Sequence, residues 1–556
     1  MTSGSRVQRS SDSRVWLKQY AAGVPADIDA TPYASLVELL EESFATFRSR
    51  RAFICMERSI SYDDLDQMSL ALAAYLQSKR LKKGARVALM MPNVLQHPVG
   101  TVAVLRAGYA VVNVNPLYTP RELEYQLKDS GAEAIIFLDS YASVVQQVIA
   151  ATTVRHVIVG SMIEGPSDKR MACELGALPD PVTFHDAIAA GYNLTFAAPK
   201  IAPDDVAFLQ YTGGTTGVSK GATLLHRNIL ANVLQNDARM QPVLREPPHT
   251  EQLFIVCALP LYHIFALMVC FLLGMRVGGV NLLIPNPRDI PGLIKELRKY
   301  QFHSFPAVNT LYNTLLNSPG FDQVDFSSLK VSCSAGMATQ QAVAEAWLNR
   351  TGCALSEAYG LSETSPALTC NRYDTKIFSG TIGFPLPSTH ISIRDENNSE
   401  VPLGEAGEIC AKGPQVMVGY WNRPDETAKV MTADGYFRTG DIGVMTPNGS
   451  IKIVDRKKDM ILVSGFNVYP NEVENAIASH PGMLECVVIG VEDARSGEAV
   501  KAFVVARDPN VTADDIIKFC ATQLTNYKIP KQIEFRTNLP KTNVGKILRR
   551  QIRDQE

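Results

Sequence analysis

Apolar and polar positions alternate along the first half of the chain in a rhythm typical of parallel α/β sheets. Short apolar runs predict buried strands at RVALMMP (86–92), YAVVNVN (109–115) and AEAIIFLD (132–139). Longer amphipathic runs predict helices between them, at NVLQHPVGTVAVLRAG (93–108) and TPRELEYQLKDSG (119–131). The second helix carries its own start signal, because Thr119 is followed by Pro120 and, three residues on, by Glu122. This βαβ order predicts a largely parallel sheet that is covered by helices.

The pattern changes after about residue 380. Turn sequences recur at short intervals, as in LPST, DENNSEVPLGEAG, TADGY and TPNGS. Short strands are predicted between them at HISIRD (390–395), GEICAKG (407–413) and SIKIVD (450–455). This part of the chain is expected to form a small β-rich subdomain.

The charged run DRKKDM (455–460) separates this subdomain from the rest of the chain and predicts a linker or hinge. The tail mixes a predicted helix, NEVENAIASH (471–480), with predicted strands at ECVVIGV (485–491) and AVKAFVVA (499–506). It is long enough for a small α+β domain. The predicted division is a loosely ordered segment 1–30, a large α/β domain 31–454, a hinge 455–458 and a small C-terminal domain 459–556.

Composition narrows the class of protein. With 556 residues the chain is too long for one hydrophobic core, so two or more domains are expected. Its 46% apolar and 20% charged residues are ordinary for a globular protein. A net charge of −2 gives no support for nucleic-acid binding or for a broad attraction to anionic membranes. The Ser/Arg-rich start is compatible with a transit peptide, but the acidic residue within it and the lack of an apolar segment favour a disordered tail.

The cysteine and histidine patterns argue against a structural zinc site. The ten cysteines form no CxxC pair, and the nine histidines form no HExxH or HxxxH motif. Reduced thiols in a cytosolic protein are the expectation.

One long apolar stretch, 253–284, raises the question of a membrane span. Pro260 and His263 interrupt it, and the unbroken part, Ile264 to Met275, has 12 residues. About 20 residues are needed to cross a bilayer. A buried helix is therefore favoured, and such a helix can form the wall of a pocket for an apolar ligand.

The run YTGGTTGVSKGAT (211–223) is rich in glycine and hydroxyl residues around one lysine. Such a loop is suited to holding phosphates, because glycines let backbone N–H groups approach an anion and the lysine adds positive charge. It is not a Walker A motif, since Ser219 stands where that motif has glycine, and it leads into a strand rather than a helix. Taken alone, the run is equally compatible with a flexible hairpin turn.

Four further motifs accompany this loop in the same order as in one known superfamily. They are YGLSETSP (359–366), YFRTGD (436–441), DRKKDMILVSGFNVYPNEVE (455–474) and PKTNVGKILRR (540–550). Together the five resemble the adenylate-forming superfamily of acyl-CoA synthetases, luciferases and peptide-synthetase adenylation domains. The resemblance extends from about residue 30 to the end of the chain. LPLYHIFAL, KGPQVMVGYW and YKIPK are most similar to the bacterial-type long-chain fatty-acyl-CoA synthetases.

The resemblance implies an ATP-dependent fatty acid:CoA ligase, an acid–thiol ligase that works in two half-reactions. A carboxylate first attacks the α-phosphorus of ATP to give acyl-AMP and pyrophosphate, and the CoA thiol then attacks the acyl carbon. Fatty acid, ATP, CoA and Mg²⁺ are the implied ligands. The first half-reaction needs alignment and neutralisation of charge rather than a protein nucleophile.

The resemblance also implies a role for each motif residue. Glu363 and Thr215 would hold Mg²⁺, Thr364 would touch the α-phosphate, and Lys220 would bind the β- and γ-phosphates. Asp441 would bind the ribose hydroxyls with help from Arg456, although an ordinary surface ion pair is the alternative for both. The nucleotide would further contact Thr212, Gly213, Gly214, Thr216, Tyr359, Gly360, Ser334, Ala335 and Gly336. Ala335 departs from the family, which usually has glycine there.

Lys546 would reach over the α-phosphate and the carboxylate, although the basic tail around it also fits a solvated lysine. Since this lysine would obstruct the thiol, the family rotates its C-terminal domain between the two half-reactions, and Lys458 stands at the pivot position. After rotation, SGFN with Gly465 would line the channel for the pantetheine arm of CoA.

The acid is the least determined part. His263 lies beside the expected acyl pocket, and Ile264 stands where amino-acid-activating relatives carry an acidic residue, which favours a long- or medium-chain fatty acid. An aryl- or coumarate-type CoA ligase, a ligase that loads a carrier protein, and a non-enzymatic fatty-acid or nucleotide sensor are the alternatives. A cytoplasmic location with transient contact at the inner face of the membrane fits such a substrate, and both monomers and homodimers occur among relatives.

Overall fold

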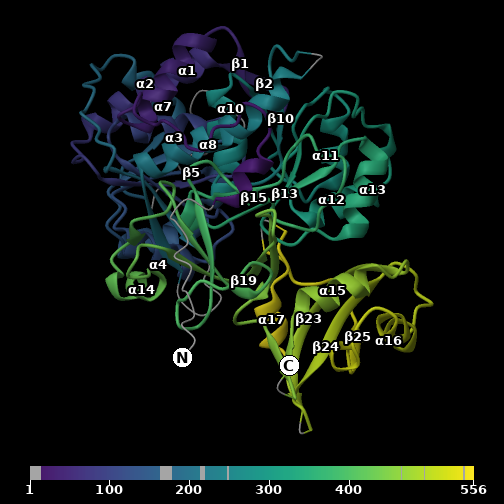
Figure 1. Cartoon of the computed structure of the whole chain (residues 1–556). Coiled ribbons are helices and arrows are strands. Elements are labelled where there is room, and N and C mark those ends of the chain that lie inside the picture. Colours follow the sequence, from purple (N-terminus) through teal and green to yellow (C-terminus); the bar gives the residue numbers. More distant parts are fainter. Residues whose placement is uncertain are drawn as a thin grey trace, which may run out of the picture.

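A computed structural model describes residues 14–162, 178–212, 219–246, 249–464, 466–493, 495–542 and 545–556. The chain forms a large body of mixed α/β structure and a smaller one made by the C-terminal residues, which lies against one side of it (Figure 1). The predicted α/β class is confirmed.

An eight-stranded sheet forms the centre of the large body. Its spatial order is β18 (Gly419–Tyr420), β9 (Lys220–Leu225), β8 (Val206–Thr212), β4 (Ala110–Asn113), β3 (Arg86–Met90), β5 (Ala134–Leu138), β6 (His156–Gly160) and β7 (Pro181–Thr183). The strands from β8 to β7 are parallel, while β9 and β18 add antiparallel pairs. The three strands predicted from the apolar runs are therefore present as neighbours β4, β3 and β5.

Side chains alternate between the two faces of this sheet and are buried on both. Val87 and Leu89 of β3 face one core together with α1 (Leu36–Phe47), α2 (Tyr62–Ser78), α3 (Gln96–Arg106) and α7 (Phe184–Gly191). Ala88 and Met90 face the other core together with α4 (Pro120–Ser130) and α5 (Ala142–Val148). Burial on both faces is what a parallel strand requires, and it explains the continuous apolar runs.

The predicted start of α4 is confirmed. The Thr119 hydroxyl accepts a hydrogen bond from the Glu122 backbone N–H at 3.4 Å, and the Glu122 carboxylate accepts one from the Thr119 N–H at 2.8 Å. Gly131 ends the helix in the left-handed conformation.

A second parallel sheet lies beside the first. Its strands are β10 (Phe254–Cys257), β11 (Val280–Leu283) and β1 (Arg51–Cys55), with β2 (Arg58–Ser61) antiparallel at the edge. Bridges through Ser304 connect it to a mixed sheet of β12 (Ser332–Ser334), β13 (Leu355–Gly360), β14 (Ala367–Cys370) and β15 (Phe384–Pro385). The associated helices are α8 (His226–Arg245), α11 (Ile290–Leu297), α12 (Asn309–Leu316) and α13 (Gln341–Thr351).

The long apolar stretch is a buried helix, as expected. It comprises α9 (Ile264–Ala266), a π-helical turn (Leu267–Leu272) and α10 (Leu273–Arg276), and most of its side chains are buried in the main core. In the described part of the chain, no helix is both long enough and apolar enough to cross a membrane.

The predicted β-rich subdomain is an antiparallel sheet of β16 (His390–Arg394), β17 (Ala406–Lys412), β19 (Phe437–Met445) and β20 (Ile451–Arg456). Helix α14 (Pro424–Val430) lies between β18 and β19 in the sequence. Residues 1–30 were expected to be loosely ordered. For residues 14–30, which the structure describes, this expectation is wrong. Trp16, in the short helix η1 (Val15–Gln19), is 5% exposed and packs into the core of this sheet, and the Tyr20 hydroxyl donates to the Pro385 carbonyl at 2.7 Å.

The C-terminal residues form a five-stranded sheet with three helices. Its elements are β21 (Ile461–Val463), β22 (Phe466–Val468), β23 (Met483–Asp493), β24 (Gly497–Ala506), β25 (Gln532–Phe535), α15 (Pro470–Ala478), α16 (Ala513–Ala521) and α17 (Arg549–Arg553). Two hydrogen bonds fasten this body to α12 of the large one. The Thr310 hydroxyl donates to the Gly545 carbonyl at 2.8 Å, and the Asn313 amide donates to the Leu484 carbonyl at 2.9 Å.

The short helical turns that complete the described chain are η2 (Asp139–Tyr141), η3 (Ile149–Ala151), η5 (Phe321–Gln323), η6 (Ser362–Thr364) and η7 (Asn526–Lys528). Of these, η6 belongs to the motif YGLSETSP and positions a candidate site residue.

A buried cation joins α1, α2 and α3. The Arg106 guanidinium, whose side chain is 2% exposed, donates to Glu41 at 2.8 Å and to Asp66 at 2.5 Å, and it lies over the Phe44 ring at 4.7 Å. It also donates to the Ser69 hydroxyl at 2.8 Å. One side chain thus satisfies acceptors from two helices.

We expect Arg106→Met to lower the free energy of unfolding by about 3 kcal/mol, because it leaves two carboxylates and a buried hydroxyl without their donor. Urea titration followed by tryptophan fluorescence measures the change. Arg48→Met is the matched control, since Arg48 also faces Asp66 but its side chain is 62% exposed, and it should cost less than about 1 kcal/mol. Equal losses in the two variants would contradict this assignment.

Candidate active site

The candidate residues follow the carboxyl ends of several strands. Thr212 ends β8, Ser334 ends β12 and Gly360 ends β13, while His263 follows β10 after a short loop. In open α/β sheets this edge is where ligands bind. These strands belong to three different sheets, so the candidate residues follow strand ends that come from separate parts of the large body.

The loop expected to hold phosphates lies between two antiparallel strands. Thr212 of β8 is paired with Lys220 of β9, and the Ser219 hydroxyl donates to the Thr212 carbonyl at 2.7 Å. This strand–loop–strand geometry differs from Walker A, as the sequence predicts. The expected contacts of Gly213, Gly214, Thr215 and Thr216 lie outside the described residues.

Glu363 is buried on η6, directly above the start of β9. Its carboxylate accepts a hydrogen bond from the Tyr420 hydroxyl at 2.8 Å, and its carbonyl accepts one from the Met417 N–H at 2.8 Å. Burial raises the pKa of Glu363, while the Tyr420 hydroxyl and the charges of Arg456 and Lys220 oppose that shift. Tyr420 was missed by the sequence reasoning, because no spacing rule connects β18 to η6.

This carboxylate fits a magnesium ion. The Glu363 carboxylate is a hard oxygen ligand that the neutral Tyr420 phenol holds in place. Such a ligand suits an ion that binds one or two protein oxygens together with phosphates. Glu363 is the described residue that would bind the ion, while Thr215 lies outside the described part.

Thr364 is completely buried. Its hydroxyl contacts the carbonyls of Leu361 and Pro366 within the same turn. The structure therefore uses the hydroxyl to shape the turn, and the expected contact with a phosphate stays a prediction. The adjacent Gly360 is required by packing, because a Cβ there would lie 1.9 Å from the Pro366 carbonyl oxygen.

Asp441, Tyr359 and Arg456 form one cluster. The Tyr359 hydroxyl donates to Asp441 Oδ2 at 2.6 Å, and Arg456 Nε lies 3.2 Å from Asp441 Oδ1. The antiparallel register of β19 and β20 places Asp441 opposite Arg456. Both carboxylate oxygens are thereby oriented, which is the arrangement that bidentate recognition of two hydroxyls needs.

Glu357 is a second residue that the sequence reasoning missed. It lies two positions before Tyr359 on β13, so both side chains point to the same face. Burial raises the pKa of Glu357 to about 8, while the hydrogen bonds of Thr339 act to lower it. Among the described residues, the Glu357 Oε2 atom has no hydrogen-bond partner. A buried, protonated carboxyl group thus lies next to the expected adenine site.

Lys546 reaches this site from the C-terminal body. Its Cε would be 3.0 Å from a Cβ at Gly336, whose φ of +84° also favours glycine. Burial, followed by the Arg456 charge, lowers the pKa of Lys546 to about 8, while Asp441 and Glu363 oppose the shift. The same structure therefore holds Lys546 among residues of the large body rather than in solvent.

His263 lies near enough to Lys546 for the charge of the lysine to act on it. Burial lowers its pKa to about 3, and the Lys546 charge acts in the same direction. Its Nδ1 accepts from the Phe265 N–H at 3.3 Å and caps the buried helix. His263 is thus a neutral residue at the start of an apolar wall.

The adenine loop is compatible with alanine. Ala335 is 8% exposed, and its N–H donates to the Ala307 carbonyl at 3.4 Å. The Ser334 hydroxyl is hydrogen-bonded to that of Thr339 at 2.7 Å. The extra methyl group at residue 335 fits in the core without breaking these contacts.

The expected pivot is surrounded by charges. Lys458 is exposed and is followed in the sequence by the carboxylate of Asp459. Arg549 binds Asp459 at 3.2 Å and Glu474 at 2.6 Å, and lies 3.8 Å from Asp455. Gly465 lies outside the described residues, and its neighbour Phe466 is 58% exposed.

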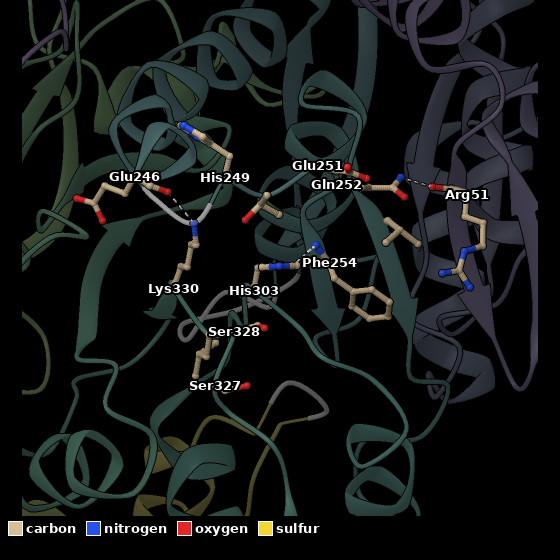
Figure 2. A pocket seen from close by; sticks show the side chains of 13 residues that line it. Arg51, Glu246, His249, Glu251, Gln252, Phe254, His303, Ser327, Ser328 and Lys330 are labelled. Atoms are coloured by element: carbon tan, nitrogen blue, oxygen red, sulfur yellow. Dashed lines mark hydrogen bonds between the residues drawn. The ribbon is translucent and has the colours of Figure 1, made fainter.

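A surface hollow elsewhere is a separate feature. A cavity of about 620 Å³ has Arg51, Phe254 and Val280 in its lining. Figure 2 shows Arg51 and Phe254 at its wall. The three residues begin β1, β10 and β11, so the cavity opens at the amino ends of the strands, opposite to the candidate site. It contains none of the predicted site residues.

Comparison with known proteins gives matches over nearly the whole chain. The family model for AMP-binding enzyme matches residues 40–421, and the model for AMP-binding enzyme C-terminal domain matches residues 472–546. The chain is 51% identical to a long-chain-fatty-acid–CoA ligase of Escherichia coli O6:H1 and 52% identical to one of Salmonella typhimurium, with 98% of both chains covered in each case. The ATP-bound MatB of Rhodopseudomonas palustris is similar in structure, with a TM-score of 0.80, 28% identity and coverage of 93% of this chain and 98% of the other.

The raised pKa of Glu357 predicts how the stability of a variant without this carboxyl group depends on pH. A carboxyl group whose folded-state pKa is raised stabilises the fold below its unfolded pKa, and this contribution is lost as the pH rises toward about 8. Glu357→Gln should therefore become steadily more stable relative to the wild type between about pH 4.5 and about pH 8. Urea midpoints across this range measure the difference, with Glu345→Gln on the exposed face of α13 as a control that should show no such trend. A constant difference for Glu357→Gln would contradict the buried, protonated state.

Proposed function

The chain belongs to the AMP-binding enzyme family, and we propose that it is an ATP-dependent ligase that joins long-chain fatty acids to coenzyme A through an acyl-AMP intermediate. One observation carries the proposal. The half-buried Lys546 of the C-terminal body lies beside Gly336 and within electrostatic reach of Glu363 and Asp441, which are the residues that would hold the metal and the ribose. Relatives about half identical over the full chain, named long-chain-fatty-acid–CoA ligases, support the substrate class.

In the first half-reaction a carboxylate oxygen of the acid bonds to the α-phosphorus as the bond to the pyrophosphate oxygen breaks. Lys546 offsets the negative charge that develops on the α-phosphoryl oxygens. Lys220 and the loop from Thr212 to Thr216 bind the β- and γ-phosphates, while Asp441 holds the ribose hydroxyls. Mg²⁺, when bound by Glu363, supplies further neutralisation of the phosphates.

In the second half-reaction the CoA thiol, as thiolate, forms the thioester bond at the acyl carbon, and AMP leaves with the electrons of the acyl–oxygen bond. The ammonium of Lys546 obstructs that approach, so the C-terminal domain rotates about Lys458 and brings the segment around Gly465 to the site. Phe466, which is next to Gly465, is exposed in the present orientation, so this segment is free to contact a ligand after the rotation.

The acyl site is formed by the buried helix after His263. A neutral histidine and Ile264 present no charge to an entering acid, and the following side chains are apolar. This wall supports an alkyl chain over an amino acid. No feature of the described residues favours an aryl acid or a carrier protein as the acceptor. A cytoplasmic location, transient contact with a membrane and a homodimer stay predictions.

The division between half-reactions is testable through Lys546. We expect Lys546→Ala to slow acyl-AMP formation about 100-fold or more, because an electrostatic contact made in the transition state is removed. Thioester formation from supplied acyl-AMP should be nearly unchanged. Pyrophosphate exchange and thioester release measure the two steps, and Lys541→Ala, which removes a lysine paired with Glu485 in the same tail, is the control. Equal loss of both half-reactions would contradict the assignment.

The acid is tested by a series from acetate to oleate, with cinnamate included, in the presence of ATP, Mg²⁺ and CoA. Mass spectrometry of the products should show the highest thioester yield with long alkyl acids. A preference for cinnamate would instead assign the pocket to aryl acids. Adenylate without a CoA thioester would point to a carrier protein as the acceptor.

A further inference from the structure

The lysine proposed to bind phosphates already has a counter-ion. Lys220 Nζ contacts the carboxylate of Glu426, a residue of α14. The side chains of Lys220 and Glu426 are 30% and 25% exposed, so the pair lies at the rim of the site rather than in the core. Lys429 binds the other oxygen of Glu426 at 2.5 Å.

The position of Lys220 does not depend on this pair. Its backbone is fixed by the register of β8 and β9, in which Lys220 lies opposite Thr212. Its ammonium group lies 5.2 Å from the centre of the Tyr420 ring, which holds it by a cation–π contact. Tyr420 is in turn hydrogen-bonded to Glu363. Without Glu426, the backbone register and the Tyr420 ring would still hold Lys220 near the site.

The two carboxylates around Lys220 have different surroundings. Glu363 is buried, and its negative charge has a proposed partner in the metal ion. Glu426 lies on the outer helix, and Lys220 followed by Lys429 holds its pKa at about 2, so it is charged at every pH of interest. A polyphosphate that approaches Lys220 therefore meets a permanent negative charge already bound to the same ammonium group.

We propose that Glu426 is an internal counter-anion of Lys220 that competes with the polyphosphate of ATP, and with pyrophosphate, and thereby weakens the binding of both. The inference rests on the proposed function, since it takes Lys220 as the phosphate-binding lysine. Lys220 exchanges one anion for another when the nucleotide binds. When pyrophosphate leaves, Glu426 takes its place, so that the lysine is never left as an unpaired charge. The residue acts on affinity and makes no contact with the reacting atoms.

The test compares Glu426→Gln with the wild type by calorimetric titration of ATP and of inorganic pyrophosphate. The variant should bind both about two- to fivefold more tightly, the range expected for loss of a partly exposed ionic competitor. The gain should shrink as the ionic strength is raised, because exposed charges are screened. Asp425→Asn, on the adjacent exposed position of the same helix, should leave both affinities unchanged.

Two further experiments distinguish the proposal from its alternatives. In a Lys220→Ala background, Glu426→Gln should no longer tighten binding, because the competition is for that lysine. Pyrophosphate is also titrated with and without Mg²⁺. Competition between Glu426 and pyrophosphate for Lys220 needs no metal, so a gain in affinity without Mg²⁺ separates it from metal binding by Glu426. Weaker or unchanged binding by Glu426→Gln, or a gain that persists without Lys220, would overturn the proposal. A wild-type protein that binds neither ATP nor pyrophosphate would instead overturn the proposed function.

Discussion

The position of one half-buried ammonium group, that of Lys546, is the constraint on which the assembled site depends. The lysine belongs to the C-terminal body, yet the groups that offset its charge, Asp441 and Glu363, belong to the large one. A buried lysine without nearby negative charge would lose its proton or leave the interior. The two hydrogen bonds from α12 to the C-terminal body hold the lysine in that environment. The docking of the C-terminal body is therefore linked to the charge state of Lys546.

The rest of the site consists of acidic groups held in different states by their surroundings. Asp441 has a partner on each oxygen, Glu363 is bound by a phenol, and Glu357 is buried with one oxygen unpartnered. Burial favours the neutral form of a carboxyl group, while a cation or donor favours the charged form. The structure thus places two hydrogen-bonded carboxyl groups where a metal ion and a ribose would bind, and a carboxyl group with a raised pKa beside the expected adenine position.

Local signals in the sequence were sufficient for much of this architecture. The apolar runs of β3, β4 and β5 were recognisable because both faces of these strands are buried, and the start of α4 because its cap lies within four residues. Family motifs supplied Asp441, Glu363 and Lys546. Contacts between distant segments were not predictable, because no spacing connects Tyr420 to Glu363 across 57 positions or Tyr359 to Asp441 across 82. Trp16 was missed because a single buried aromatic residue in a polar segment leaves no periodic pattern.

The charged cluster around Arg549 has a consequence for how the C-terminal domain moves. If Lys458 is the pivot, Asp455 lies before it and Arg549 after it, so their approach belongs to one orientation of the domain only. The Asn471 N–H, which donates to Asp455 at 2.8 Å, is subject to the same condition. Leaving this orientation would break both of these contacts with Asp455. If the domain rotates between the half-reactions as proposed, the lifetime of the present orientation, more than the flexibility of the hinge, would set the pace of the alternation.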